Sequence, residues 1–201
     1  MSDAPARPRG RPRTFDEETA LDELTALFWR KGYSQTSVAD LVESSGVHKP
    51  SLYRIFGSKE ELFATVLRRY MNTRIEMFGQ LVDGVGPGIE GIHTFLSLLR
   101  DDVVSGTSRH GCLLVASSTE LGGTTPGFED FGPAYRDAVR RFTRRLVERA
   151  GGSEELIAQR TELLVTWMLG LDVTTRGAGD EAEIDRIVDA MHATVDTWST
   201  D

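Results

Sequence analysis

The sequence has 201 residues, a net charge of −8 at pH 7 and 39% apolar residues, which suits one compact unit or two small domains sharing a core and excludes bulk disorder. Its single cysteine excludes an intrachain disulfide and is typical of a protein in the reducing cytoplasm. No apolar run approaches the length of a membrane span, and no signal-peptide hydrophobic region follows the N-terminus.

Residues 1–13 form a separate basic arm, rich in proline and arginine and without apolar periodicity. This composition predicts disorder in the isolated segment. Its centre, PRGRP, resembles an AT-hook, in which Arg9 and Arg11 would lie in the narrow minor groove of A·T-rich DNA. The alternative is a generic basic tail that raises affinity for any nucleic acid.

The next segment predicts a helix over residues 15–31. Thr14 and Glu17 have the spacing of a capping box, and apolar residues then recur at helical spacing from Ala20 to Phe28. We expect this helix to be structural, with Trp29 and Tyr33 closing a small core.

Two short helices follow, separated by a glycine turn. Ser37 and Asp40 predict a capping box that starts the first helix, and Gly46 predicts its end, because glycine accepts the left-handed conformation. The second helix is expected over residues 47–55, where Pro50 is tolerated in the first turn. Gly57 ends it, and a capping box at Ser58 opens a longer helix.

The second short helix is expected to expose a polar face with Lys49, Pro50, Ser51, Tyr53 and Arg54. This layout is that of a helix-turn-helix that reads DNA in the major groove. Composition alone is equally compatible with a helical hairpin that has a solvated polar face.

The order of residues distinguishes these two interpretations. The segment from Phe15 to about Phe63 resembles the N-terminal domain of TetR-family (tetracycline-repressor-like) transcriptional regulators. The resemblance depends on Gly32, Thr36-Ser37-Val38, Leu41, Ser45-Gly46-Val47, Leu52-Tyr53, Phe56, Ser58-Lys59-Glu60 and Leu62. The sequence departs from the family at Ile55, where His or Tyr is frequent and can contact the DNA backbone.

We therefore expect a DNA-binding surface with groove contacts from Lys49 and Arg54. The full predicted set is Thr36, Ser37, Lys49, Pro50, Ser51, Tyr53, Arg54 and Lys59, together with Arg9 and Arg11 of the arm. The charge distribution agrees with a DNA-binding surface in the N-terminal part of the chain. Residues 1–70 carry 11 Lys and Arg against 10 Asp and Glu, whereas residues 71–201 carry 12 against 21, so the second part would be repelled by phosphates.

The predicted fold is all-α. A three-helix DNA-binding domain (14–62) follows the arm (1–13), and a long helix over residues 58–81 joins it to a helical effector-binding and dimerisation domain (63–201). Further helices are expected at about 89–105, 112–121, 131–150, 153–176 and 181–198. The arginine-rich face of the helix from Tyr135 predicts ion pairs with acidic neighbours, with a second nucleic-acid surface as the alternative.

The last two helices each carry apolar residues at the spacing of a packed helix seam. One alternative is that these residues face the core of a single subunit. We instead predict a dimer interface, an interpretation that the TetR resemblance strengthens and that suits a palindromic operator. The predicted interface residues are Leu164, Leu171, Ile184, Val188, Met191 and Val195, and a neighbouring stripe contains Leu156, Leu163 and Trp167.

The function that follows is a dimeric repressor released from a palindromic operator by a small-molecule effector. Candidate pocket residues are Phe78, Phe95, Leu99, Cys112, Val115, Trp167 and Met168. The histidines are scattered and no catalytic motif stands out, so we predict no metal site, no cofactor and no enzyme. Alternatives are an architectural DNA-binding protein without an effector, and a repressor that senses electrophiles or oxidants through Cys112.

Overall fold

The computed structural model describes residues 16–105, 110–122, 127–177 and 180–198, and the described part forms helices and their connections without strands. The arm with Arg9 and Arg11 lies outside the described residues. The helices are α1 (Glu17–Lys31), α2 (Val38–Ser45), α3 (Lys49–Phe56), α4 (Lys59–Gly84), α5 (Gly88–Val104), α6 (Leu113–Leu121), α7 (Phe131–Ala150), α8 (Glu154–Arg176) and α9 (Glu181–Val195). The prediction of an all-α fold is confirmed.

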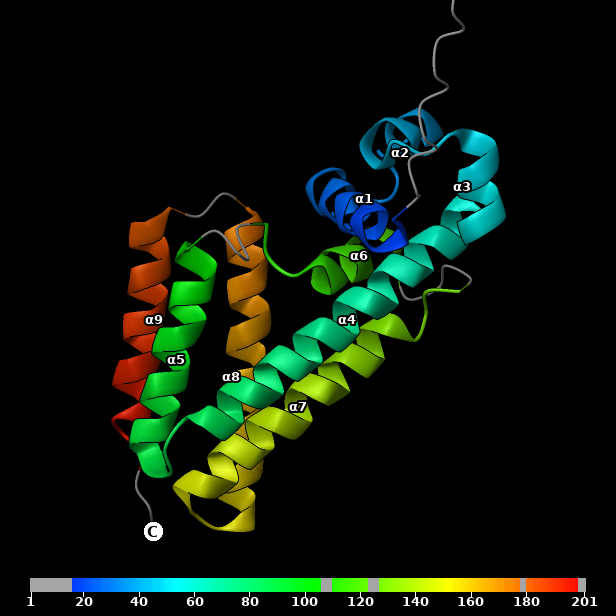
Figure 1. Ribbon diagram of the computed structural model, residues 1–201. Helices are drawn as coiled ribbons and strands as arrows, with labels where there is room; N and C mark the ends of the chain where they lie inside the picture. The colour runs from blue at the N-terminus through cyan, green and yellow to red at the C-terminus, as the bar shows by residue number, and fades with distance from the viewer. Residues whose placement is uncertain (1–15, 106–109, 123–126, 178–179, 199–201) are drawn as a thin grey trace, which may run out of the picture.

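Helices α1–α3 form a head at one end of α4, and the other helices form a body around the remainder of α4 (Figure 1). Helix α4 lies beside α7, α7 packs on α8, and α5 packs on α9 (Figure 1). Because α4 is a continuous helix of 26 residues, it connects the head to the far end of the body.

Local sequence signals explain where the helices of the head begin. Two of the three predicted capping boxes are present, Ser37 with Asp40 at α2 and Ser58 with Glu61 at α4. At α1 the cap is Asp16 rather than the expected Thr14, and its carboxylate accepts hydrogen bonds from the amide of Glu18 and the hydroxyl of Thr19. The helix therefore starts two residues later than predicted.

The core of the head is continuous with that of the body. Phe28 and Phe63 pack with ring centroids 4.6 Å apart, and both side chains are buried. Trp29 and Tyr33 cover this core as expected, but they also contact the body. Trp29 Nε1 donates to the carbonyl of Gly111 at 2.8 Å, and the Tyr33 ring lies 5.8 Å from the ring of Phe128.

The predicted dimer interface is wrong, because the side chains assigned to it face the core of one subunit. Helix α9 turns its apolar stripe onto α5, and α8 turns one of its two stripes inward against α7. The buried residues are Leu164, Leu171, Ile184, Val188, Met191 and Val195. The stripe left half-buried on the outside contains Leu163 and Trp167 of α8 and Ile187 of α9.

Most of the predicted pocket residues are also ordinary core. Phe78, Phe95, Leu99 and Met168 are buried, and Phe78 stacks on Phe142 with ring centroids 5.0 Å apart. Trp167 lies instead in an outer groove between α8 and α9. Cys112 and Val115 do line a cavity, between α6, the end of α8 and the head.

The arginine-rich face of α7 forms ion pairs with acidic neighbours, as predicted. Arg140 pairs with Glu162 at 2.5 Å, and Arg144 pairs with Glu154 at 2.7 Å. Arg145 pairs with Asp83 near the end of α4. These pairs join α7 to α8 and α4.

Gly111 precedes α6 at the contact between head and body, with φ +65°. A Cβ at this position would collide with the backbone carbonyl oxygen of Asp172, which cannot move without shifting α8. We expect Gly111→Ala to cost about 1–2 kcal/mol for the left-handed conformation and about 1–3 kcal/mol for the collision. Urea unfolding followed by circular dichroism measures this loss.

Gly122, after α6, is the matched control for this prediction. It has φ +63°, but no atom of the described residues, its chain neighbours aside, lies within 4 Å of the position that a Cβ would take. Gly122→Ala should therefore lose only the stability that the left-handed conformation costs an alanine, without any loss from a collision. Equal losses in the two variants would contradict the close approach of Gly111 to α8.

Candidate nucleic-acid interface

The turn between α2 and α3 fixes the angle at which α3 leaves the head. Gly46 adopts the left-handed conformation with φ 66°, and its amide donates to the carbonyl of Val42 at 3.0 Å. The hydroxyl of Ser45 then accepts a hydrogen bond from the amide of Val47, whose side chain is buried. This tight connection is what a helix-turn-helix requires.

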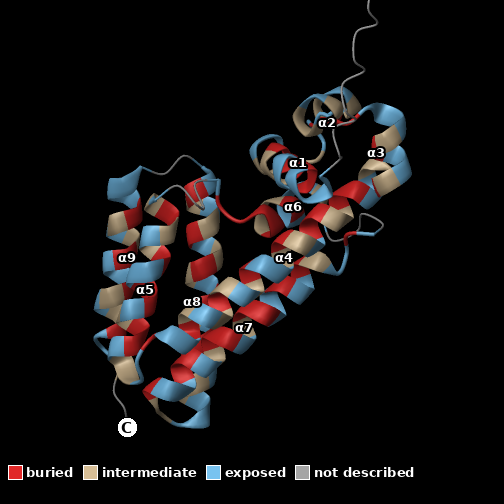
Figure 2. Ribbon diagram, in the orientation of Figure 1, coloured by how far each residue is buried: buried red, intermediate tan, exposed pale blue. Residues whose placement is uncertain are grey.

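Helix α3 buries one side and exposes the other. Leu52 and Phe56 are buried, whereas Lys49, Tyr53 and Arg54 are exposed. Figure 2 shows much of the visible surface of α3 as exposed or intermediate. Neither Lys49 nor Arg54 forms an ion pair or hydrogen bond with any residue that the structure describes, although Lys49 Nζ lies 5.7 Å from the centre of the Tyr53 ring. Both cationic groups are therefore available to a partner.

Pro50 and Ser51 complete the first turn of α3. Pro50 is exposed and Ser51 is half-buried. His48 is the N-cap residue, but its side chain makes no capping hydrogen bond. The helix thus starts at Lys49, two residues later than expected, and its first turn presents a short, nearly uncharged surface beside Lys49.

Two predicted contacts of α2 change in the structure. Thr36 is buried, and its hydroxyl donates to the carbonyl of Gly32 at 2.6 Å, so its prediction as a phosphate contact is wrong. Ser37 is exposed, but its hydroxyl is held in the capping box by Asp40 at 2.8 Å. The outward groups of this segment are the backbone amides at the start of α2, a position that favours anions.

Lys59 is the first residue of α4, which begins next to the end of α3 (Figure 1). It is half-buried, and its Nζ lies 4.2 Å from the centre of the Tyr33 ring. Burial, together with a hydrogen bond to Glu60, raises the pKa of Tyr33 to about 12, so this phenol stays neutral. Ile55 is half-buried against the core, which agrees with its departure from the family pattern.

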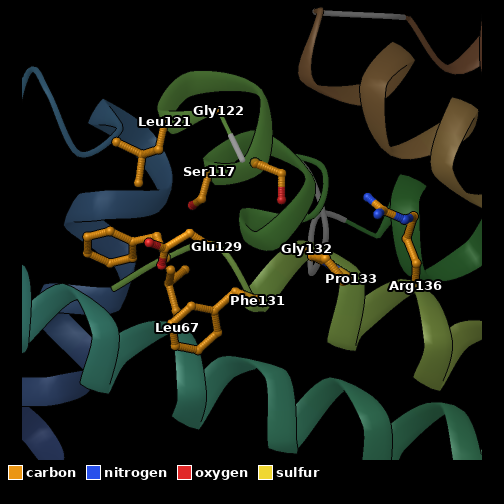
Figure 3. A pocket seen from close by; sticks show the side chains of 11 residues that line it. Leu67, Ser117, Leu121, Gly122, Glu129, Phe131, Gly132, Pro133 and Arg136 are labelled. Carbon is orange, nitrogen blue, oxygen red and sulfur yellow. The ribbon is translucent and has the colours of Figure 1, made fainter. Parts of the chain in front are cut away.

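A small cavity of about 220 Å³ lies between α4, α6 and the start of α7. Figure 3 shows Leu67, Ser117 and Phe131 around it, with Arg136 to one side. Its volume is below the range of about 300–1,000 Å³ that is usual for small-molecule sites. A second cavity, of about 450 Å³, lies between the head, α6 and the end of α8, and we call it the junction cavity.

Cys112 is the N-cap residue of α6, and it is buried. Burial first, and then the nearby Asp172, raise the pKa of its thiol to about 11, although a hydrogen bond with Tyr135 acts in the opposite direction. The thiol is therefore protonated at neutral pH, whereas a reactive cysteine requires the thiolate. This environment favours packing over sensing, and no cluster of metal-ligating side chains occurs in the described ranges.

Cys112 belongs to a cluster of polar side chains inside the body that the sequence did not predict. We call it the buried polar cluster. Its members, from α4, α6, α7 and α8, are Tyr70, Arg74, Cys112 and Tyr135, which are buried, and Asp172, which is half-buried. Arg74 also pairs with Asp102 of α5 at 3.2 Å. Burial raises the pKa of Asp172 to about 7, partly offset by Arg74 and reinforced by Asp102.

This shift predicts a pH dependence of stability. Between pH 3.8 and about 7 the native state holds a proton on Asp172 that the unfolded chain has lost, so stability should fall as pH rises through this window. Asp172→Asn should remove that part of the slope of the unfolding free energy against pH, measured with urea. Asp189→Asn, a change at an exposed carboxylate of α9, is the control, and equal slopes in the two variants would contradict the assignment.

The head matches a known family of sequences. Residues 20–66 match the domain described as bacterial regulatory proteins, tetR family. The chain is 53% identical over 64 residues to the HTH-type transcriptional repressor ComR of Escherichia coli (strain K12), a match that covers 32% of this chain and 30% of ComR. The chain thus spans less than a third of the length of this curated relative.

Two further similarities extend into the body. The HTH-type transcriptional repressor KstR2 of Rhodococcus jostii (strain RHA1) is 26% identical over 165 residues, which cover 82% of this chain and 68% of KstR2. A structure of the TetR family transcriptional regulator CifR, a cysteine mutant complexed with 26 bp of double-strand operator DNA, has a TM-score of 0.80 and 26% identity. That similarity covers 94% of this chain and 100% of the CifR chain.

No helix within the described ranges is long and apolar enough to cross a membrane. The family match covers the head and the first turns of α4. Residues 20–66 form a TetR-family DNA-binding domain, and the chain has the fold of the TetR family transcriptional regulator CifR over almost its whole length.

Proposed function

We propose that this protein is a sequence-specific DNA-binding transcriptional regulator that acts as a dimeric repressor. The observation that carries the proposal is the outer face of α3, where Lys49 and Arg54 are exposed without a described partner. ComR and KstR2 are named repressors, and CifR was solved on operator DNA, which supports the assignment. Arg54 and Lys49 would contact base edges, and Tyr53 and Lys59 would contact phosphates.

The proposed dimer uses the outer surface of α8 and α9, in place of the buried stripe predicted from the sequence. Trp167, Ile187, Ala190 and Thr194 line a groove on this surface. Trp167 and Trp198 stack with ring centroids 6.5 Å apart, which extends the apolar strip. A twofold axis through this face would set the spacing of two heads for the two halves of a palindromic operator.

The proposed effector acts through contacts between head and body. Glu120 near the end of α6 accepts hydrogen bonds from the amides of Tyr33 and Ser34, at 3.0 and 2.6 Å. A ligand that displaces α6 or α4 would move the head and mismatch the two heads to successive major grooves. Repression would then be relieved because the ligand raises the population of dimers whose two heads no longer fit successive major grooves.

Two alternative functions remain distinguishable. An architectural DNA-binding protein would bind without sequence preference and without a response to any ligand. A thiol-based sensor would require a thiolate at Cys112, which its burial and raised pKa disfavour. The proposal includes no catalysis, so turnover of a bound compound would contradict it.

Selection of bound duplexes from a random pool tests the proposed function. We expect a short palindrome, followed by saturable release of the protein from that site by one member of a small-molecule library. The proposed minor-groove contacts of Arg9 and Arg11 predict A·T-rich flanks in the selected duplexes. Recovery of unrelated sequences with equal affinity would favour the architectural alternative.

The proposed division of the chain is a basic arm (1–13), a DNA-binding domain (14–62) and an effector-binding and dimerisation domain (63–201). Because a bacterial regulator of this type must reach the chromosome, the proposed location is the cytoplasm.

A further inference from the structure

The junction cavity differs from a gap within the body, because the head forms part of its wall. Its lining comes from the end of α1 and the following loop, from α6 and from the last turns of α8. Cys112, Val115, Ala116 and Val173 supply apolar surface. Its volume of about 450 Å³ lies in the range that is usual for sites that bind small molecules.

Among the described residues, four charged residues line the junction cavity, and three of them form ion pairs or hydrogen bonds. Lys31 Nζ pairs with Asp40 at 2.7 Å. Glu120 accepts two backbone hydrogen bonds from the head. Arg176 Nη1 donates to the carbonyls of Trp29 and His110, at 3.2 and 3.3 Å.

Asp172 is the fourth, and its carboxyl group accepts no hydrogen bond from any residue that the structure describes. The charges that act on it are Arg74, which is paired with Asp102, and Asp102 itself. Asp172 is half-buried, and carboxyl groups that are shielded from water are normally hydrogen-bonded, because desolvation without compensation is unfavourable. No cationic side chain in the described part of the chain forms an ion pair with Asp172, so its carboxyl group can accept a donor from a ligand.

We infer that the junction cavity binds a small organic ammonium compound, with the nitrogen donating to Asp172 and the hydrocarbon part packed against Val115 and Ala116. A neutral ligand would leave the carboxylate without a counter-charge, and an anionic ligand would meet both Asp172 and Glu120. Because Gly32 and Gln35 of the head line the same cavity, occupation would alter the contact between head and body. This effect on DNA binding rests on the proposed function, whereas the binding of the ammonium compound does not.

The test uses the full chain without DNA and two amines with neutral counterparts. Phenethylamine is compared with phenethyl alcohol, and hexylamine with hexanol. Binding is followed by calorimetry and by the indole N–H resonance of Trp29, which donates to the carbonyl of Gly111 beside the cavity. We expect saturable binding of at least one amine, with its alcohol about tenfold weaker or worse, because a hydrogen bond to a charged group is lost.

Variants assign the binding to the cavity. Asp172→Asn keeps the shape of the side chain and should weaken amine binding about tenfold or more, whereas the exposed Asp189→Asn on α9 should leave it unchanged. Ala116→Leu should fill the cavity and weaken both members of each pair. Thermal unfolding of each variant verifies that the fold is retained.

Any of three results would overturn the inference. They are that neither amine binds saturably, that an amine and its alcohol bind with equal affinity, or that Asp172→Asn binds the amine as tightly as the parent. Adding the bound amine to the protein on its selected operator tests the regulatory part separately. A changed operator affinity in the parent but not in Asp172→Asn supports it, and an unchanged affinity overturns it. Failure to select any operator would instead contradict the proposed function and leave the binding result intact.

Discussion

Replacing Lys49 and Arg54 together by alanine is expected to weaken binding to the preferred operator roughly a hundredfold or more. Each contact from a basic side chain to a base edge contributes about 1–3 kcal/mol, and neither side chain has an intramolecular ion pair to lose among the described residues. The discrimination between the operator and unrelated duplexes should shrink as well, because base contacts carry sequence preference. Fluorescence anisotropy with both duplexes measures the two effects.

The matched control removes two positive charges from helices other than α3. Arg68 of α4 and Arg141 of α7 are exposed and form no ion pair in the described part of the chain. Their double alanine variant should lower affinity only slightly, and equally on both duplexes. If the loss of affinity in this variant equalled that of the α3 variant, the interaction would be non-specific electrostatic attraction rather than groove reading by α3.

Lys59→Ala should cause a loss of affinity between those of these two variants. It should weaken binding to all sequences similarly and flatten the salt dependence.

Ile187→Asp is expected to convert the dimer into a folded monomer, whereas Val188→Asp should disrupt the fold of the subunit. The two residues are neighbours on α9, but Ile187 lines the outer groove and Val188 is buried against α5. A carboxylate at Val188 would lack partners in the core and should cost about 3–5 kcal/mol of stability. At Ile187 it would remain hydrated in the monomer and become buried only on association.

Sedimentation and circular dichroism distinguish the two outcomes. The Ile187 variant should keep its helical signal and thermal stability while its mass halves, and its operator affinity should fall because the two heads are no longer linked. Glu183→Asp, at the edge of the same groove, keeps the charge and should remain dimeric. A dimer of unchanged stability in the Ile187 variant would place the interface on another surface.

The sequence predicted what depends on neighbours along the chain. Ser37 with Asp40 and Ser58 with Glu61 mark helix starts whose geometry involves only four residues, and both were found at the expected positions. The exposure of Lys49, Tyr53 and Arg54 on α3 followed in the same way from the residue pattern within one helix. These signals, with the order of residues around Gly46, were enough to predict the fold and the exposed face of α3.

What the sequence could not predict depends on segments far apart in the chain. Two apolar stripes occur on α8, and spacing alone cannot tell which one faces the same subunit, so Leu164 was assigned to the interface while Leu163 and Trp167 lie outside. Thr36 has a hydroxyl group that could contact a phosphate, but this hydroxyl donates to the carbonyl of Gly32, four residues earlier in the chain. The environment of Asp172 is created by α4 and α5, which no local pattern reveals.

The two hydrogen-bonded contacts of α6 with the head lie at opposite ends of this helix. The carbonyl of Gly111 before α6 accepts from the Trp29 indole, and Glu120 near its end accepts from the amides of Tyr33 and Ser34. Gly111 and Glu120 are nine positions apart in the sequence, which corresponds to about 13 Å along a helix. A bond at one end alone would leave the head able to pivot about it, whereas two bonds resist rotation of the head against α6. We therefore expect that a small rotation of this short helix would turn the head, and with it the DNA-reading surface of α3.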